Sequence, residues 1–171
     1  MDKEGCDNRT MRIKTWLSGK FDVREAEKRG KGAYANQPIL KGEVIGVHGG
    51  IVVHENEIGE LTRTVPEEKL NLDHAMYIHP GLILLHDYEN GCDPMCFINH
   101  CCTPNAHMEH GIVMVASRDI ASGEEITWDY RQTDDVGSWE YEFKCECGSP
   151  DCKGFVRVGP RHREARLSSS N

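Results

Sequence analysis

Phe97-Ile98-Asn99-His100-Cys101-Cys102-Thr103-Pro104-Asn105 is the stretch of this sequence that decides its fold. Three further cysteines stand near the C-terminus in a Cys-x-Cys-x4-Cys pattern, at Cys145, Cys147 and Cys152. Three thiolates are one ligand short of a closed tetrahedral zinc site, so the fourth must come from elsewhere. Cys102 is the best candidate. A zinc ion bound in this way would dock the C-terminal segment onto Asn99 and His100 and build a pocket between the two segments.

The remaining composition limits the class of protein. A chain of 171 residues is long enough for one domain with a true core but too short for two. Eight cysteines raise the alternative of a disulfide framework, but their uneven spacing and the absence of a signal-like N-terminus favour thiols and metal. No apolar run is long enough to cross a bilayer. We therefore expect an intracellular protein that does not span a membrane.

The net charge indicates the kind of partner. A formal charge of -8 argues against direct binding to nucleic acid, which needs a basic face, and is compatible with a basic protein or peptide. Acidic residues collect in the C-terminal third and could present a negative rim to a basic peptide, although, taken alone, they are better explained as a solvated surface: Asp129, Asp134, Asp135, Glu140, Glu142, Glu146 and Asp151.

Glycine-punctuated, β-branched runs predict a mainly β fold of several short sheets with little helix. The expected strands are 21–23, 30–35, 44–47, 51–53, 76–78, 82–85, 112–116, 126–130 and 139–144. Gly49-Gly50 reads as a hairpin turn between two of them, and one short helix is expected after Pro66. In the last strand, aromatic and charged residues alternate, so that its rings line either the core or a ligand.

Four patterns in order carry a family resemblance: Gly30-x-Gly32, Asn99-His100-x-Cys102-x-Pro104-Asn105, Gly123-Glu124-Glu125-Ile126-Thr127-Trp128-Asp129-Tyr130, and the C-terminal cysteines. The set resembles the SET-domain protein lysine methyltransferases with a post-SET zinc segment. This resemblance implies a SET fold with a knot-like C-terminal crossing and a zinc-stapled flap. It implies an N-terminal tail (1–18), a SET domain (19–133), a post-SET segment (139–158) and a C-terminal tail (159–171).

The resemblance also implies a cofactor and the residues that hold it. S-adenosylmethionine would contact the main chain from Lys31 to Tyr34, where Gly30 and Gly32 permit close approach, although a plain turn is the alternative for these glycines. Asn99 and His100 would hold the cofactor by hydrogen bonds. The zinc bound by Cys102, Cys145, Cys147 and Cys152 would be structural, because four thiolates leave no open position.

Tyr130 is the expected catalytic residue and would also touch the cofactor. Methyl transfer to an amine is an in-line displacement that needs alignment in a dry channel, and a tyrosine hydroxyl can orient the amine and stabilise charge. Trp128 would line the substrate channel, and its size leaves the number of methyl groups open. Tyr77 is a second channel and catalytic candidate, with a core tyrosine as its alternative.

The expected activity is S-adenosylmethionine-dependent methylation of a lysine, with a histone tail as substrate and a nuclear or chromatin location; a non-histone substrate would allow a cytoplasmic one. A catalytically silent SET module that binds a peptide or partner protein is the alternative. Cys101 and Cys96 depart from the family pattern. Cys92 and Cys96 suggest a second metal site, but no matching Cys or His pair is evident, and we interpret them as free buried cysteines.

Overall fold

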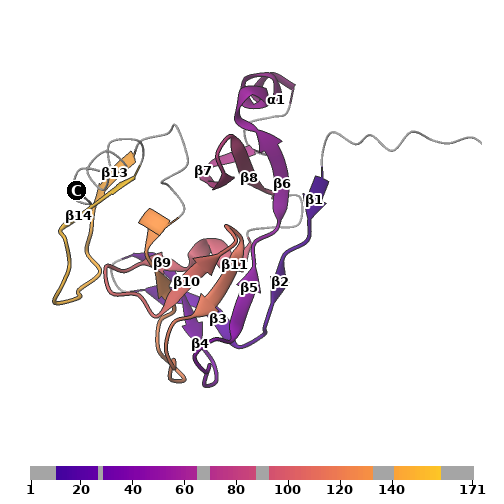
Figure 1. The fold of residues 1–171 in the computed structure, drawn as a ribbon. Helices are drawn as coiled ribbons and strands as arrows, with labels where there is room; N and C mark the ends of the chain where they lie inside the picture. Colours follow the sequence, from indigo (N-terminus) through magenta and orange to yellow (C-terminus); the bar gives the residue numbers. More distant parts are fainter. Residues whose placement is uncertain (1–10, 27–28, 65–69, 88–92, 133–140, 159–171) are drawn as a thin grey trace, which may run out of the picture.

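The computed structural model of the chain describes residues 11–26, 29–64, 70–87, 93–132 and 141–158. Their strands form two four-stranded antiparallel sheets and three two-stranded pairs. The first sheet has the order β1-β6-β8-β7, with strands Met11–Ile13, Gly50–His54, Leu82–Asp87 and Leu70–His79. The second has the order β10-β11-β5-β2, with strands Ala106–Glu109, Val113–Ala116, Val44–Val47 and Trp16–Leu17. The predicted mainly β fold is therefore confirmed (Figure 1).

The two-stranded pairs flank the second sheet (Figure 1). They are β3–β4 (Phe21–Ala26 and Gly30–Ala35), the parallel pair β9–β12 (Asn99–His100 and Thr127–Trp128), and β13–β14 (Tyr141–Lys144 and Phe155–Val158). Within the ranges that the structure describes, the helical elements are α1 (Ile58–Thr64) and the 3-10 turns η1 (Glu55–Glu57), η4 (Pro94–Phe97) and η5 (Tyr130–Gln132). Among the described residues, no helix is long and apolar enough to cross a membrane.

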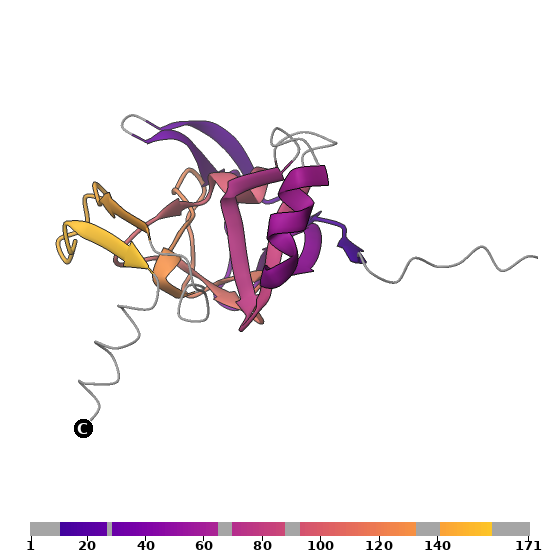
Figure 2. The same cartoon turned by 90° about the horizontal axis from the view of Figure 1, so that it is seen from above.

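Two apolar clusters explain why the run from Leu82 to Leu85 lacks polar residues. Leu84 faces the main core, which includes Ile45, Met95 and Met114, whereas the alternate residues Ile83 and Leu85 face the opposite side. That side is covered by α1, through Ile58 and Leu61 (Figure 2). Because successive strand residues point to opposite faces, a strand buried on both faces is apolar throughout. Each such side chain stabilises the fold by about 1.5–3 kcal/mol.

The hairpin predicted at Gly49-Gly50 is wrong. β5 pairs with β11 and β2, whereas β6 pairs with β1 and β8, so the chain crosses here from one sheet to the other. The glycines serve close packing: a Cβ on Gly49 would lie 2.2 Å from the Thr15 amide nitrogen, and one on Gly50 would lie 2.2 Å from the Leu85 carbonyl oxygen. A pair of glycines in the sequence indicates that the backbone is closely packed, but it does not predict which strand the next strand pairs with.

Three other boundaries differ from expectation. Residues 1–18, predicted as a tail, include β1 and β2, each paired into a sheet. The described helix of the middle region is α1, while residues 65–69, where the helix after Pro66 was expected to begin, lie outside the described residues and β7 starts at Leu70. The strand expected over 126–130 contains only Thr127 and Trp128, because Tyr130 begins η5.

Candidate functional site

The site is organised around the parallel pair β9–β12, which sets Asn99 beside Thr127 and His100 beside Trp128. Asn105 holds the two segments together from a buried position, 2% exposed. Its amide nitrogen donates to Glu124 Oε1 at 2.9 Å and to the Glu125 carbonyl at 2.8 Å, while its amide oxygen accepts from the Thr127 N–H at 2.8 Å. The two motifs recognised in the sequence are thus one structural unit.

A second network surrounds Asn99. Its amide nitrogen donates to the Lys31 carbonyl at 3.0 Å and to Glu125 Oε1 at 2.8 Å. The other carboxylate oxygen of Glu125 accepts a hydrogen bond from the Arg29 guanidinium at 2.5 Å. Arg29 also donates to the His100 carbonyl at 3.2 Å. Gly32 lies against this network, since a Cβ there would sit 2.8 Å from Glu125 Oε1. The Lys31 backbone, the Arg29 cation and Asn99 are therefore mutually positioned.

The contacts of His100 define its protonation. Nδ1 accepts the Tyr130 backbone N–H at 3.2 Å, so the ring proton resides on Nε2, which lies 3.4 Å from Cys102 Sγ. Burial lowers the pKa of His100, and although the nearby Asp129 carboxylate acts to raise it, the net shift favours the neutral ring. Neutral His100 thus links Tyr130 to the cysteine cluster.

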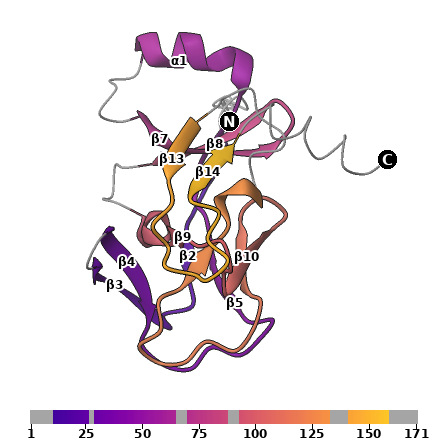
Figure 3. The same cartoon turned by 90° about the vertical axis from the view of Figure 1, so that its left-hand side faces the viewer.

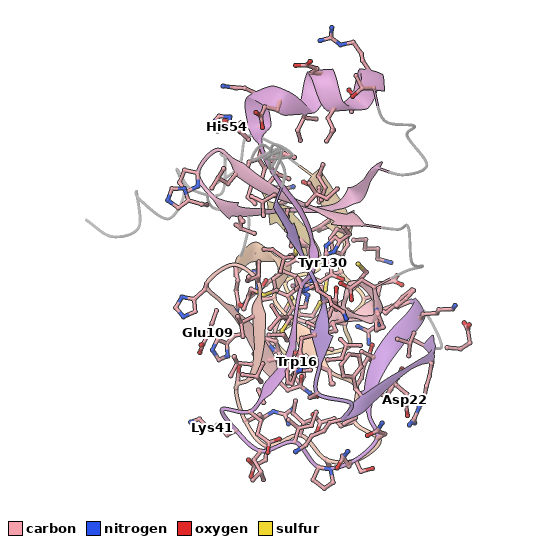
Figure 4. The ribbon with its side chains drawn as sticks, turned by 90° about the vertical axis from the view of Figure 1, so that its right-hand side faces the viewer. Trp16, Asp22, Lys41, His54, Glu109 and Tyr130 are labelled. Atoms are coloured by element: carbon pink, nitrogen blue, oxygen red, sulfur yellow. The ribbon has the colours of Figure 1, made fainter. Side chains whose placement is uncertain are left out.

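Tyr130 lies near the middle of the molecule (Figure 4). Its hydroxyl donates to the Ile98 carbonyl at 3.1 Å, and its ring contacts those of Trp128 and His100 at centroid distances of 5.1 and 5.4 Å. Burial raises the pKa of Tyr130 to about 12, so the phenol remains protonated at neutral pH. It is therefore available as a fixed, neutral hydrogen-bonding group.

A cavity of about 210 Å³ opens beside these residues. Segments far apart in the sequence line it: Arg29, Asn99, His100, Tyr130 and the flap residues Phe143, Lys144, Cys145, Glu146 and Cys147. Phe143 closes one wall, with its ring centroid 6.2 Å from that of His100 and 6.1 Å from that of Tyr130. Figure 3 shows the β13–β14 flap on the side where β9 lies. The cavity thus combines polar groups with an aromatic wall.

The four cysteines predicted as one set lie together. The sulfur atoms of Cys102, Cys145, Cys147 and Cys152 are all within 4.8 Å of one another, and those of Cys102 and Cys145 are 3.8 Å apart. Four thiolates bound to zinc at about 2.3 Å in a tetrahedron stand about 3.8 Å apart, so the donor set and its spacing fit this ion.

The surroundings of the four sulfurs favour a thiolate at Cys147, whereas burial raises the pKa of Cys102 and of Cys145. Backbone N–H groups of Lys153 and Gly154 donate to the sulfurs of Cys102 and Cys152 at 3.5 and 3.4 Å. Burial acts to raise the pKa of Cys147, but hydrogen bonds from backbone amides and neighbouring thiols outweigh it and lower the value to about 6. The cluster therefore offers at least one ready anion to a cation.

Not every predicted site residue reaches the cavity. Tyr77 is 3% exposed and packs in the second apolar cluster, where its hydroxyl donates to Glu55 Oε2 at 3.2 Å. Trp128 is 6% exposed and belongs to the main core behind Tyr130. Tyr34 pairs with Glu125 through an isolated β-bridge, and Gly30 adopts φ 69° with nothing within 4 Å of its Cβ position. Cys96 and Cys101 form no disulfide with another described residue, whereas Cys92 lies outside the described residues.

The sequence reasoning missed Arg29, Glu125, Asn105 and Phe143 as parts of the site. Glu125 and Asn105 stood inside quoted motifs, and Phe143 stood in the aromatic alternation, whereas Arg29 carried no signal beyond its position before Gly30. Trp139 and Glu140 of that alternation lie outside the described residues.

Much of the predicted acidic rim is internally paired. Asp129 forms an ion pair with Arg131 at 2.5 Å, and Glu146 forms one with Lys144 at 2.8 Å. Glu142 forms an ion pair with Arg157. Asp134, Asp135 and Glu140 lie outside the described residues. The described part of the rim therefore presents less unbalanced charge than its sequence indicated.

Comparison with known proteins places this geometry in a family. The SET domain model matches residues 30–131. In Yarrowia lipolytica, a "Histone-lysine N-methyltransferase, H3 lysine-36 specific" is 31% identical over 90% of this chain and 20% of the relative. A "Histone-lysine N-methyltransferase, H3 lysine-4 specific" from the same organism is 33% identical over 73% of this chain and 11% of the relative. The chain thus spans about a fifth or less of the length of these relatives.

Solved structures agree on the fold. The methyltransferase domain of human histone-lysine N-methyltransferase SETMAR superposes with a TM-score of 0.60 at 21% identity, covering 84% of this chain and 60% of that one. KRYPTONITE, solved in complex with mCHG DNA and SAH, gives a TM-score of 0.57 at 22% identity, and the match covers 81% of this chain and 29% of that one. With the parallel β9–β12 pair and the cysteine cluster beside it, the matched model assigns this chain to the SET domain family.

Proposed function

We propose that this chain is an S-adenosylmethionine-dependent protein lysine N-methyltransferase, with a SET domain over residues 19–133 and a post-SET zinc segment over 139–158. The observation that carries the proposal is the cavity in which Asn99, His100 and Tyr130 meet the flap. Relatives named histone-lysine N-methyltransferases and the SAH complex of a structural neighbour support it.

The residues around the cavity suit this cofactor. Asn99 orients the Lys31 carbonyl, Arg29 supplies a cation where a carboxylate would bind, and Phe143 offers an aromatic face to a base. Zinc held by Cys102, Cys145, Cys147 and Cys152 would fasten the flap that carries Phe143. A site of this kind forms only when the C-terminal segment has docked.

The cofactor supplies a methyl group on a sulfonium, which passes to a neutral amine as the sulfur becomes a thioether. The protein's task is to align the amine and exclude water. The Ile98 carbonyl and the Tyr130 phenol oxygen lie together and can each accept an amine N–H, which leaves the nitrogen lone pair to face the methyl carbon. The substrate lysine must lose one proton to solvent before the transfer, since its ordinary pKa is about 10.4, and the product carries the positive charge as a methylated ammonium.

A histone tail is the proposed substrate, and the chromatin of the nucleus the proposed location. The relatives carry specificities for lysine-4 and lysine-36 of H3, and a net charge of -8 favours a Lys/Arg-rich peptide over a nucleic acid.

Calorimetry with S-adenosylmethionine on zinc-loaded protein tests the cofactor, and mass spectrometry of H3 peptides containing lysine-4 or lysine-36 tests the transfer. Tyr130→Phe is the matched variant: it removes one hydroxyl while keeping the ring contacts, and should lower turnover by about 10- to 100-fold with cofactor affinity nearly unchanged. Cofactor binding without transfer to any histone or cell-extract protein would favour a silent peptide-binding module. Absence of cofactor binding would refute the proposal.

A further inference from the structure

A second group of metal-ligating side chains lies in the interior, separate from the four cysteines. His48, His86 and Asp93 place one donor atom each within 4.8 Å of one another. The two histidines are 2% and 3% exposed, and the Asp93 side chain is 7% exposed. None of the three lines the cavity at Tyr130.

The three residues come from separate elements that meet at one point. His48 lies on the crossing between β5 and β6, His86 lies in β8, and Asp93 is the N-cap of η4. The Gly49 and Gly50 positions leave no room for a Cβ, so the crossing that carries His48 is tightly packed. This point joins the two main sheets to the turn that leads into Asn99 and His100.

The distances suit an ion shared by the three groups. His86 Nδ1 and Asp93 Oδ2 are 3.9 Å apart, beyond hydrogen-bond range. The ring centroids of His48 and His86 are 5.2 Å apart, with an angle of 61° between the ring planes. Ligands bound to a tetrahedral zinc ion at about 2.0–2.2 Å stand about 3.3–3.6 Å apart. The His86–Asp93 pair needs to close by about 0.5 Å, and the remaining pairs need to close by at most about 1.5 Å.

Hydrogen bonds hold the Asp93 carboxylate in a defined orientation. Oδ2 accepts from Thr15 Oγ1 at 2.8 Å, Thr15 Oγ1 accepts in turn from the Gly49 N–H at 3.1 Å, and Oδ1 accepts from the Met95 N–H at 2.9 Å. Each carboxylate oxygen has a second lone pair for a cation. Metal-binding carboxylates are oriented in this way by groups that do not touch the ion.

We propose that His48, His86 and Asp93 bind a divalent transition-metal ion, with zinc as the expected occupant, at the junction of the two sheets. Two imidazoles and one carboxylate are a ligand set that zinc accepts, with water completing the coordination. Its burial away from the cavity gives the ion a structural role: it would fix η4 and thereby the start of the Asn99–His100 segment. This inference does not depend on the proposed function.

The test counts and identifies bound metal in the full chain. Protein stripped with a chelator and reloaded with zinc should retain two equivalents after desalting, measured by mass spectrometry of the metal. In cobalt-loaded protein, charge-transfer bands from thiolate to metal report the cysteine cluster alone, whereas nitrogen and oxygen ligands contribute weaker visible bands. The two sites are thus observed independently.

Asp93→Asn is the sharpest variant, because asparagine caps a helix as well as aspartate does and keeps an oxygen acceptor for Met95, while the anionic ligand is lost. It should weaken the second zinc at least 10-fold, with the thiolate bands unchanged. His86→Gln should do the same. His107→Gln is the control and should keep both ions, because His107 forms hydrogen bonds with Ser117 and Glu109 and is not one of the three proposed ligands.

Circular dichroism of each metal-free variant verifies that it folds, and a variant that does not fold is replaced by the other. One zinc equivalent in the wild type, bound with the thiolate signature alone, would overturn the proposal. So would wild-type affinity for the second ion in folded Asp93→Asn and His86→Gln.

Discussion

Replacing Gly32 by alanine tests whether the Asn99 network positions the proposed cofactor site. The added carbon would lie 2.8 Å from Glu125 Oε1, 3.1 Å from Asn99 Nδ2 and 3.1 Å from Tyr34 Cε2. A Cβ essentially never approaches an oxygen so closely, so the Glu125 carboxylate must shift, and we expect its 2.8 Å hydrogen bond with Asn99 to open. Asn99 would then release the Lys31 carbonyl as well.

The magnitude follows from the bond that is lost. A hydrogen bond to a charged group contributes about 1.5–3 kcal/mol. If that loss appears in the bound state, the dissociation constant for S-adenosylmethionine rises about 10- to 150-fold, at about 1.4 kcal/mol for each factor of ten. Calorimetry measures this constant directly, and urea unfolding measures any accompanying loss of stability.

Gly42→Ala provides the matched control. Gly42 has φ 83° and nothing within 4 Å of its Cβ position, so alanine there introduces backbone strain of about 1–2 kcal/mol without touching the site. Its stability should fall while its cofactor affinity stays at the wild-type value. A Gly32→Ala protein that binds the cofactor as tightly as the wild type would refute the role assigned to Asn99.

Three further perturbations address the flap and the acid stability. Cys147→Ser should release zinc, abolish activity and expose the β13–β14 flap to proteolysis; retention of both metal and activity would contradict the split four-cysteine site. Phe143→Ala should weaken cofactor binding several-fold, with Phe143→Leu intermediate, as measured by calorimetry, because one wall of the cavity is lost. Burial acts to raise the pKa of Glu124, but hydrogen bonds from Arg118, Asn105 and the Ala121 amide outweigh it and lower the pKa below its ordinary 4.5. The ionised form therefore stabilises the fold above about pH 4.5, and this stabilisation is lost as the pH falls through the lower folded value. Urea unfolding of Glu124→Gln from pH 3 to 6 should show a shallower pH dependence than the wild type, and an unchanged slope would exclude this contribution.

Sequence reasoning was strongest where a motif carried its own geometry. Cys102 could be joined to the distant cysteines because tetrahedral zinc demands a fourth ligand, and the structure brings all four sulfurs together. Period-two burial and glycine turns located most strands. Asn99, His100 and Tyr130 were expected in one place, and they line one cavity.

The features that sequence reasoning missed are long-range ones. Arg29 and Glu125 are separated by 96 positions, and no local pattern announces their ion pair. The Gly49–Gly50 crossing has the composition of a turn, since local preference does not encode which sheet receives the next strand. The surroundings of the Tyr77 side chain depend on the face of β7 to which it points, and a single aromatic residue in a strand does not identify that face.

The parallel pair β9–β12 has a consequence for how the protein folds. Two residues from each strand form it, and its members are 28 positions apart in the chain. So short a ladder offers little to offset the entropy of closing that loop, and Cys102 meets Cys145 only after a further 43-residue closure. We therefore expect the β3–β4 hairpin to form early and the cavity to form last. During synthesis, a chain released before Cys152 would hold most of the core but have no completed site.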